Sequence, residues 1–229
     1  PRRAMTAARS IGPYDIVRLL DAGGMGKVYL AREREGVAKG RLVVVKTIRA
    51  EYERTPEHVE SFHREARVLA HMRHPNIVQL HDAGRVGHRL YMAMEYLEGL
   101  DVAKVLKLMS ARGERIPPEV AVHIGREIAL ALEAAHGYEI EPGKPGGRVH
   151  RDLSPHNVFL LYGGGVKLLD FGLARAYGED GTTRTGMVKG KFRYMAPEQA
   201  RGEALDRRVD IFALGLVLHE MLAGTRAYE

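Results

Sequence analysis

The stretch HRDLSPHN, residues 150–157, decides how the rest of this chain is interpreted. It places a carboxylate, Asp152, and a carboxamide, Asn157, five residues apart. A carboxylate can accept the proton of a hydroxyl group, and the amide oxygen of an asparagine suits a hard cation such as Mg²⁺. Alone, the stretch is equally compatible with a surface loop that holds a local ion pair. Its meaning depends on the segments that flank it.

The segment before this stretch is mostly strand-like. Short β-branched runs, separated by glycine-rich or charged turns, cover residues 16–23, 27–33, 41–48, 77–84 and 89–97. A helix interrupts them at residues 58–72, where apolar side chains recur three and four residues apart and Ser61 faces the other way. The apolar positions of that helix are Val59, Phe62, Ala66, Leu69 and Ala70. We therefore expect a small N-terminal antiparallel sheet with one helix.

Beyond residue 97 the apolar pattern becomes helical. Residues 101–113 and 117–138 are amphipathic, and prolines open the second of these helices. Residues 139–148 contain five glycines and prolines, so we expect a flexible connection there rather than an element. The expected fold class is α+β, with a basic N-terminal extension (1–13), an N-terminal lobe (14–97) and a mainly helical C-terminal lobe (98–229).

Composition limits the classes of function. With 45% hydrophobic and 28% charged residues the chain has an ordinary globular balance, and the absence of cysteine excludes disulfides and Cys-ligated metals. The net charge of +6 forms no concentrated basic run, so we expect no nucleic-acid partner. The longest apolar run has eight residues, 211–218, so we expect no membrane segment in this sequence. We expect a cytoplasmic domain, which is compatible with a membrane-anchored full-length protein.

Further motifs stand in order along the chain. A glycine-rich turn, GGMGKV at 23–28, lies between two expected strands, where backbone N–H groups can close on a phosphate. Because a strand and not a helix follows it, a Rossmann nucleotide site is excluded. Lys46 ends an apolar strand, and Glu65 on the following helix is the partner that would orient its ammonium group. The triplets DFG and APE follow at residues 170–172 and 196–198.

Taken in order, these motifs resemble those of the eukaryotic-like (Hanks-type) protein kinase family. HPNIVQL at 74–80, MEYLEG at 94–99 and DRRVDIFALGLVLHEML at 206–222 match the family as well. The GGMG turn, Ser154 and the glycine- and proline-rich insertion are similar to bacterial serine/threonine kinases in particular. The resemblance implies a two-lobed protein-kinase-like fold with a truncated C-terminal lobe, because relatives continue with several more helices.

The resemblance also implies a phosphoryl-transfer site. Asp152 would position the substrate hydroxyl group, and Lys46, held by Glu65, would contact the phosphates of ATP. Asn157 and Asp170 would hold the metal ion. The remaining nucleotide contacts would come from Gly23, Gly24, Gly26, Val28, Val44, Met94 and Phe159, and from the backbone of Glu95 and Leu97. The implied cofactors are ATP and Mg²⁺, with Mn²⁺ as an alternative.

Some positions depart from the family pattern. Asp21 stands where the first loop glycine is usual, and Val44 stands where an alanine is usual. Ser154 replaces the lysine that serine/threonine kinases carry two residues after the catalytic aspartate, and Lys191 replaces a threonine. We hypothesise a charge swap, in which Lys191 is a further catalytic residue near the γ-phosphate and Ser154 supplies the lost hydroxyl group. The alternative is that Lys191 points to solvent.

The expected function is transfer of the γ-phosphate of ATP to serine and threonine hydroxyl groups of protein substrates. We expect regulation by autophosphorylation of Thr183 and Thr185, because a phosphate in this segment can order it by pairing with arginine. The alternative is a nucleotide-binding pseudokinase that serves as a scaffold with little or no turnover. The physiological substrate, dual specificity and dimerisation are left open by the sequence.

Overall fold

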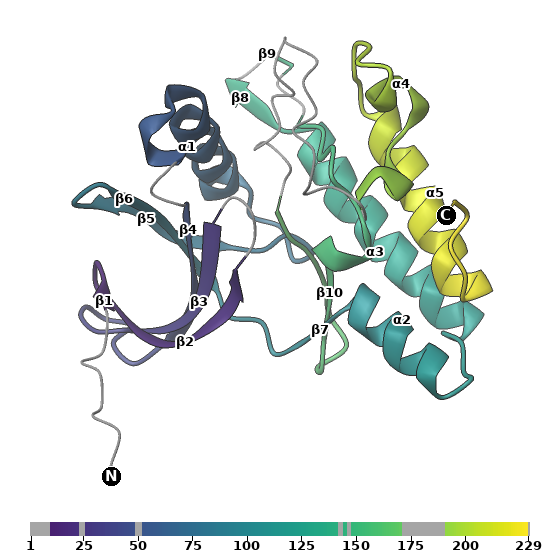
Figure 1. Ribbon diagram of the computed structural model, residues 1–229, viewed down its shortest axis with the longest axis horizontal. Helices are drawn as coiled ribbons and strands as arrows, with labels where there is room; N and C mark the ends of the chain where they lie inside the picture. Colours follow the sequence, from purple (N-terminus) through teal and green to yellow (C-terminus); the bar gives the residue numbers. More distant parts are fainter. Residues whose placement is uncertain are drawn as a thin grey trace. The chain divides into compact units, whose positions relative to one another are not determined.

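The computed structural model describes residues 10–22, 26–48, 52–141, 144–145, 148–170 and 191–228 (Figure 1). Two compact units make up this part of the chain. The first contains the described residues up to Ala70 together with Gln79–Tyr96, and the second contains His71–Val78 and the described residues from Leu97 onward. The division after Tyr96 lies next to the expected lobe boundary. Residues 71–78, which the sequence placed in the N-terminal lobe, pack with the second unit.

A six-stranded antiparallel sheet dominates the first unit, in the order β1-β2-β3-β4-β6-β5. Its strands are β1 (Ser10–Ile11), β2 (Tyr14–Ala22), β3 (Gly26–Glu33), β4 (Leu42–Ile48), β5 (Leu80–Val86) and β6 (Arg89–Glu95). The five longer strands match the predicted runs. Strand β1 lies in the segment expected to be an extension, and it pairs with β2 through Ile11 and Tyr14, which are both buried. The sheet therefore begins before Tyr14.

The alternation of side chains along β4 gives the sheet two different faces. Val43 and Val45 point to one face, where they are buried in a hydrophobic cluster. The other buried members of that cluster are Ile11, Tyr14, Ala31, Tyr91 and Ala93. Val44 and Lys46 alternate with the two buried valines and so point to the opposite face. The apolar cluster holds the strands together, and the opposite face is left for α1 and the candidate site.

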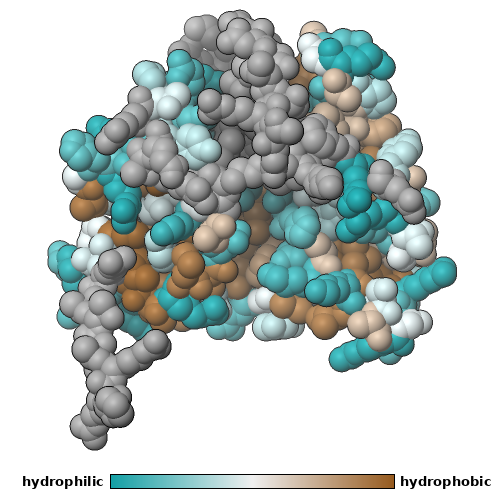
Figure 2. Space-filling view, in the orientation of Figure 1, coloured by the Kyte–Doolittle hydropathy of each residue, from teal (hydrophilic) through white to brown (hydrophobic). Residues whose placement is uncertain are grey.

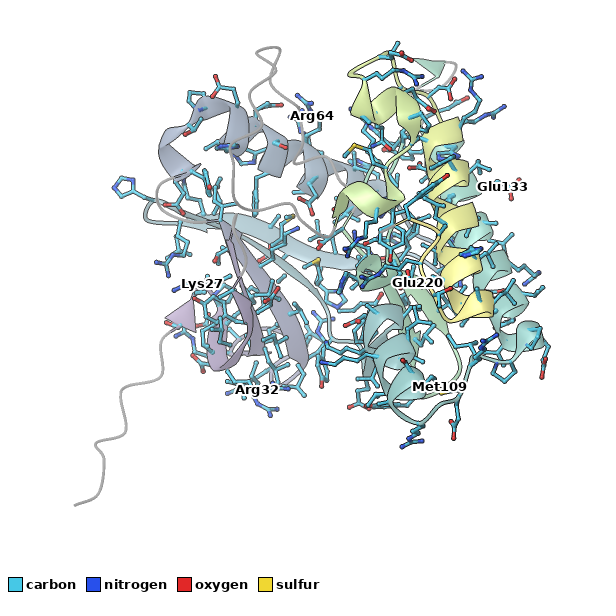
Figure 3. All side chains as sticks on the ribbon, turned by 45° about the vertical axis from the view of Figure 1, so that its right-hand side comes forward. Lys27, Arg32, Arg64, Met109, Glu133 and Glu220 are labelled. Carbon is cyan, nitrogen blue, oxygen red and sulfur yellow. The ribbon has the colours of Figure 1, made fainter. Side chains whose placement is uncertain are left out.

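Helix α1 (Pro56–His71) belongs to the first unit, where a short 3₁₀ turn η1 (Tyr52–Arg54) precedes it. Its predicted apolar face is buried at Phe62, Ala66 and Leu69. Two expectations for this helix are wrong, because Ser61 is buried and Ala70 is exposed. Ser61 stands one helical turn before Glu65, which is also buried, so both lie on the inner side. Arg64, labelled in Figure 3, marks the exposed side of α1.

Exposed apolar side chains gather on strand β2. Val17, Leu19 and Leu20 are 52%, 49% and 37% exposed. Figure 2 shows apolar residues over β2 and β3, at the lower left of the view. Strand β1 pairs with β2 only at residues 14–15, so no described strand pairs with the rest of this edge. The apolar run at 16–20 predicted the strand correctly, but not that its side chains stay accessible.

Helices form most of the second unit, together with a three-stranded sheet in the order β11-β10-β7. The helices are α2 (Val102–Ala111), α3 (Pro118–His136), α4 (Pro197–Ala200) and α5 (Arg208–Ala223), with the 3₁₀ turns η2 (Pro155–Asn157) and η3 (Lys191–Tyr194). The strands are β7 (Gly99–Asp101), β10 (Val158–Leu161) and β11 (Val166–Leu168). Helices α3 and α5 lie side by side (Figure 1), because Gly125 leaves room for Leu218 where a Cβ atom would lie 2.6 Å from it.

Local signals fix the ends of these helices. Asp101 accepts a hydrogen bond from the Lys104 N–H at 2.8 Å and so caps α2. Helix α3 begins at Pro118, where proline loses no helical hydrogen bond. Helix α5 ends at Ala223 and is capped by Gly224, whose φ of 71° is unfavourable for residues with a Cβ. In the described part of the chain, no helix has both the length and the apolar character needed to cross a membrane.

The glycine- and proline-rich segment at 139–148 differs from its prediction. Instead of a connection without structure, it contains a short antiparallel ladder between β8 (Glu139–Glu141) and β9 (Lys144–Pro145). A two-residue strand can end in proline because an edge position does not require its N–H group. The composition correctly predicted a break after α3, but it could not predict the pairing of the two arms.

Candidate active site

Lys46 and Glu65 form an ion pair within the first unit. Lys46 Nζ donates a hydrogen bond to Glu65 Oε1 at 2.8 Å. The Glu65 side chain is 3% exposed, whereas that of Lys46 is 24% exposed. Removing a carboxylate from water is costly unless a cation compensates, so Glu65 needs this partner. The lysine stays accessible enough to meet a ligand while its ammonium group is held in place.

The face of the sheet that carries Lys46 also carries the expected nucleotide contacts of this unit. Val28 lies directly opposite Lys46 in the β3–β4 pair, and Val44 lies opposite Met94 in the β4–β6 pair. Opposite residues in an antiparallel pair share a face, and every second residue returns to it. The structure therefore brings Val28, Val44, Lys46 and Met94 to one side of the sheet.

Gly26 and Glu95, which were also predicted to contact the nucleotide, make contacts inside the sheet. A Cβ atom at Gly26 would lie 1.9 Å from the carbonyl oxygen of Thr47, so only glycine fits there. Glu95 Oε1 accepts the N–H of Gln79 at 2.8 Å, and the N–H of Glu95 donates to the carbonyl of Gln79 at 3.0 Å. The side chain of Glu95 is thus turned toward Gln79, and any nucleotide contact from this position would use its backbone.

In the second unit, Asn157 is fixed to Asp152. Asn157 Nδ2 donates to the carbonyl oxygen of Asp152 at 2.6 Å and lies 3.5 Å from Asp152 Oδ2. The backbone N–H of Asn157 donates to the carbonyl of Ser154 at 2.9 Å, which closes the η2 turn. These bonds use the nitrogen donors of Asn157, and none of them occupies its amide oxygen, an atom that can only accept.

The β10–β11 hairpin brings Asp170 to the same place. Val158 pairs with Leu168, and the N–H of Leu169 donates to the carbonyl of Asn157 at 2.8 Å. Asn157 immediately precedes β10 and Asp170 lies two residues after β11. Because the two strands are antiparallel, both residues lie at the same end of the hairpin. Asp170 has φ = 47°, in the left-handed region. An amide oxygen and a carboxylate are oxygen donors of the kind that Mg²⁺ accepts, so this pair fits a divalent cation.

The buried imidazole of His150 connects these two segments. His150 Nδ1 accepts the backbone N–H of Asp152 at 3.3 Å, and His150 Nε2 lies 3.0 Å from the carbonyl oxygen of Leu169. A carbonyl oxygen only accepts, so Nε2 is the donor of this hydrogen bond. His150 belongs to the motif at residues 150–157, but the sequence alone indicated no role for it.

Asp210, near the start of α5, holds the backbone of the same loop. Its Oδ2 accepts the N–H of His150 at 2.7 Å, and its Oδ1 accepts the N–H of Arg151 at 2.8 Å. His136 Nε2, at the end of α3, lies 2.7 Å from Asp210 Oδ2. Arg151 has φ = 63°, a conformation that costs about 1–3 kcal/mol when a side chain is present. Sequence reasoning missed Asp210, although a carboxylate inside the apolar pattern of residues 209–222 was a usable signal.

Ser154, one partner in the hypothesised charge swap, is buried with 2% exposure. Its Oγ has no hydrogen-bond partner among the described residues. A buried hydroxyl group without a partner is costly, so this atom is a natural place for a further contact. The side chain of Lys191, the other member of the swap, lies outside what the structure describes, and the swap stays a hypothesis.

Residues before and after α5 in the sequence contact Glu220 on that helix. Tyr194 donates a hydrogen bond to Glu220, labelled in Figure 3, and Arg226 Nε lies 3.4 Å from Glu220 Oε1. Burial is the main cause that raises the pKa of the Tyr194 phenol above its usual value, and the hydrogen bond to Glu220 adds to it. The phenol therefore stays protonated at neutral pH and remains a donor.

The remaining predicted residues are distributed as follows. Gly23, Gly24, Thr183 and Thr185 lie outside the described residues. Leu97 belongs to the second unit, as does Phe159, which pairs with Asp101 across β10 and β7. The structure thus gathers one group of predicted residues around Lys46 in the first unit. It gathers a second group around Asp152 in the second unit.

Comparison with known proteins identifies the family. The family model described as the protein kinase domain matches residues 14–229. The chain therefore belongs to the protein kinase family. This confirms the resemblance seen in the motifs and the predicted kinase-like α+β fold.

Two curated relatives align with almost the whole chain. The tyrosine-protein kinase MasK of Myxococcus xanthus is 44% identical over 218 residues, which cover 95% of this chain and 34% of MasK. The serine/threonine-protein kinase PrkC of Bacillus subtilis is 38% identical over 221 residues, which cover 96% of this chain and 32% of PrkC. The chain spans about a third of the length of these relatives.

A solved structure shows the same fold. The crystal structure of the Mycobacterium tuberculosis PknI kinase domain aligns with a TM-score of 0.73 and 28% sequence identity. The alignment covers 99% of this chain and 80% of that domain. This chain is therefore shorter than the kinase domain that it matches.

Proposed function

We propose that this chain transfers the γ-phosphate of ATP to serine and threonine hydroxyl groups of protein substrates. The observation that carries the proposal is the linked set of Asp152, Asn157 and Asp170 in a member of the protein kinase family. The Lys46–Glu65 pair supports it from the first unit. PrkC, a relative by sequence, is named a serine/threonine-protein kinase.

The proposed roles follow from the chemistry of each group. The ammonium of Lys46, oriented by Glu65, binds phosphate oxygens of the nucleotide. The Asp152 carboxylate accepts a hydrogen bond from the substrate hydroxyl group and takes its proton as the new P–O bond forms. The bond between the γ-phosphorus and the bridging oxygen breaks, and ADP leaves with the electron pair. Little covalent chemistry is asked of the protein, so positioning and charge stabilisation supply most of the rate.

Asn157 and Asp170 are the proposed ligands of the divalent cation. Members of the protein kinase family use ATP together with such a cation. We propose Mg²⁺, with Mn²⁺ as the alternative, because both proposed ligands donate through oxygen. When bound, the cation neutralises charge on the phosphate oxygens. Transfer measured with each metal, and after its removal by a chelator, distinguishes the two and should be lost without either.

The test is transfer of radiolabelled γ-phosphate to a generic basic protein and to the chain itself. We expect label in the wild type with ATP and Mg²⁺, and a loss of about 100-fold or more in Asp152→Asn, which keeps the shape but not the basic carboxylate. A thermal-shift titration with ATP checks that the variant is folded and still binds nucleotide. Equal labelling of the two proteins would overturn the proposal.

A pseudokinase scaffold is the rival, and it is not favoured. Two departures from the family pattern support it, namely Asp21 and the exchange at Ser154 and Lys191. Against it stands the Lys46–Glu65 pair at 2.8 Å. A scaffold has no need to keep a buried carboxylate matched to a lysine at the nucleotide face. Nucleotide binding without any label in the transfer experiment would revive this rival.

Tyrosine phosphorylation is a second candidate with its own support. MasK, the relative at 44% identity, is named a tyrosine-protein kinase. The lysine that serine/threonine kinases carry two residues after the catalytic aspartate is Ser154 here. Acid hydrolysis of the labelled product and separation of the phosphoamino acids decides between the candidates. Phosphoserine and phosphothreonine support the first, and phosphotyrosine alone supports the second.

Autophosphorylation of Thr183 and Thr185 is the proposed form of regulation. A phosphate carries about −1.5 to −2 charge at neutral pH and can order a segment by pairing with arginine. Fragment mass spectrometry after incubation with ATP and Mg²⁺ should locate phosphate on these threonines. Labelling that spares the whole segment 171–190 would show that regulation has another basis.

A further inference from the structure

The peptide groups on both sides of Arg151 are held by side chains from distant parts of the chain. Arg151 immediately precedes Asp152 and has a left-handed backbone, with φ = 63°. Its N–H donates to Asp210 Oδ1 at 2.8 Å. Its carbonyl oxygen accepts from Gln199 Nε2 at 2.9 Å. A non-glycine residue keeps such a conformation only where its surroundings enforce it, and these two bonds act on opposite ends of the residue.

Gln199 uses both ends of its carboxamide. While Nε2 bonds the Arg151 carbonyl, Oε1 accepts the backbone N–H of Ala196 at 3.2 Å. Ala196 immediately precedes α4, so this second bond satisfies a donor at the start of a helix. One side chain thus ties the segment at 196–200 to a loop residue 48 positions earlier in the sequence.

The geometry points to Gln199 as a positioning residue for Asp152, an inference that rests on the proposed function. The Asp152 carboxylate is useful only if the peptide that carries it has a fixed orientation. That peptide is the one whose carbonyl oxygen Gln199 holds. Gln199 touches neither substrate nor nucleotide in this account, and it acts through the backbone of Arg151 and Asp152.

The simpler explanation is that Gln199 only satisfies the Ala196 N–H at the start of α4. A substitution that changes one end of the Gln199 amide distinguishes this helix-start role from the positioning role. Gln199→Glu keeps an oxygen that can accept the Ala196 N–H. It replaces the donor to Arg151 by a second oxygen, which repels the carbonyl group. A helix-start role therefore survives this substitution, whereas the positioning role does not. Gln199→Ala removes both bonds.

The experiment measures transfer at saturating protein substrate over a range of ATP concentrations. We expect kcat to fall about 10- to 100-fold in both Gln199→Glu and Gln199→Ala, because small displacements of a catalytic group are costly. The KM for ATP should stay within about twofold, since the nucleotide contacts are elsewhere. Arg201→Ala is the control, because this exposed side chain lies on the same segment and pairs with Glu203. It should retain the wild-type kcat.

A second readout does not depend on activity. Hydrogen exchange of peptides that contain Arg151 and Asp152 should become faster in Gln199→Glu, while peptides from α3 and α5 keep their protection. Wild-type kcat in Gln199→Glu, or a fall in Gln199→Ala alone, would overturn the inference in favour of the helix-start role. If the wild type transfers no phosphate, the proposed function fails. Hydrogen exchange then decides the inference by itself, and unchanged exchange in Gln199→Glu would reject it.

Discussion

Glu65 in the first unit and Asp210 in the second are both buried carboxylates, with 3% and 1% of the residue exposed. Glu65 pairs with the ammonium group of Lys46. Asp210 accepts two backbone N–H groups, from His150 and Arg151, and lies within hydrogen-bond distance of His136. The first carboxylate orients a side chain that is proposed to meet the nucleotide. The second fixes the backbone on which the proposed catalytic residue is carried.

This difference explains why one of them was found from the sequence and the other was not. A carboxylate that pairs with a lysine can be identified because both members of the pair are charged residues at expected positions, one at the end of a strand and one on the following helix. A carboxylate that binds backbone N–H groups has no partner residue type, because every residue except proline offers the same donor. Side chains that hold backbone are therefore visible only after folding has brought distant segments together.

The largest effect on stability is expected for Asp210→Ala. The substitution leaves two backbone donors and His136 without their acceptor inside the second unit, which should cost about 3–5 kcal/mol of unfolding free energy. For a chain of this length that corresponds to a fall of roughly 10 °C in Tm. Urea and thermal unfolding measure it. Glu133→Ala, at an exposed position of α3 in the same unit, is the control and should change the free energy by less than about 0.5 kcal/mol. Similar losses in the two variants would show that the contacts of Asp210 contribute no special stability.

A smaller loss is expected for Glu65→Gln. The substitution keeps the size of the side chain and removes the charge that Lys46 faces, but the lysine is partly exposed and can turn to water. We expect a loss of about 1–3 kcal/mol in the same unfolding assay. Glu60→Gln is the matched control, because Glu60 lies on the same helix and its pair with Arg67 is exposed. Its effect should be near zero. A larger loss of unfolding free energy for Glu65→Gln than for Asp210→Ala would contradict the expectation that Asp210 contributes more to stability.

Lys191→Ala tests whether the site has a further cation of its own. If the charge swap is correct, the rate of peptide phosphorylation should fall by more than about tenfold, or roughly 1.4 kcal/mol in activation free energy. A lysine that points to solvent predicts an almost unchanged rate. Lys189→Ala, two residues earlier, controls for a general loss of positive charge. Equal rates in both variants and the wild type would reject the swap.

The smallest expected effect is a loss of stability at alkaline pH. Burial, with the hydrogen bond to Asp82 as the next cause, raises the pKa of Tyr91 from 10.0 to about 12. Tyr14, which also donates to Asp82, has its pKa raised mainly by burial. Both phenols stay neutral in the folded protein after the unfolded chain has begun to ionise. Their contribution is therefore fully present below pH 10 and lost as the pH rises through about 12.

Urea unfolding across this pH range should show a loss of about 1–2 kcal/mol that Tyr91→Phe reduces. Tyr162→Phe serves as the control, because Tyr162 is 77% exposed and should leave the pH dependence unchanged. A pH dependence that is the same in Tyr91→Phe as in the wild type would assign the alkaline loss to other groups.

The sequence predicted those elements of the fold whose structure is set by residues close together in the chain. The β-branched runs gave the longer strands, and the spacing of apolar residues gave α1, α2 and α3. Strand β1 was missed because two residues carry no periodicity and are defined only by pairing with β2. The β8–β9 ladder was missed because glycine and proline indicate a turn and not what its arms do. Ser61 was misplaced because a polar residue on an inner helix face looks like a surface residue.

The candidate site divides in the same way. Lys46, Glu65, Asp152, Asn157 and Asp170 could be identified from short motifs, and the structure adds the contacts that hold them. The roles of His150, Asp210 and Gln199 depend on hydrogen bonds to backbone groups elsewhere in the fold. The bond of Gln199 to Arg151 spans 48 residues, and that of Asp210 to His150 spans 60. No local pattern encodes such a bond. The residues that position a catalytic group are therefore the part of the site that is hardest to predict from the sequence.

The central claim is that both buried carboxylates serve one phosphoryl transfer. Its most direct test is the transfer rate at saturating ATP in Glu65→Gln and Asp210→Asn, measured beside the wild type at a temperature where unfolding shows all three to be folded. We expect a fall of about tenfold or more in each variant. A wild-type rate in either folded variant would contradict the role assigned to that carboxylate.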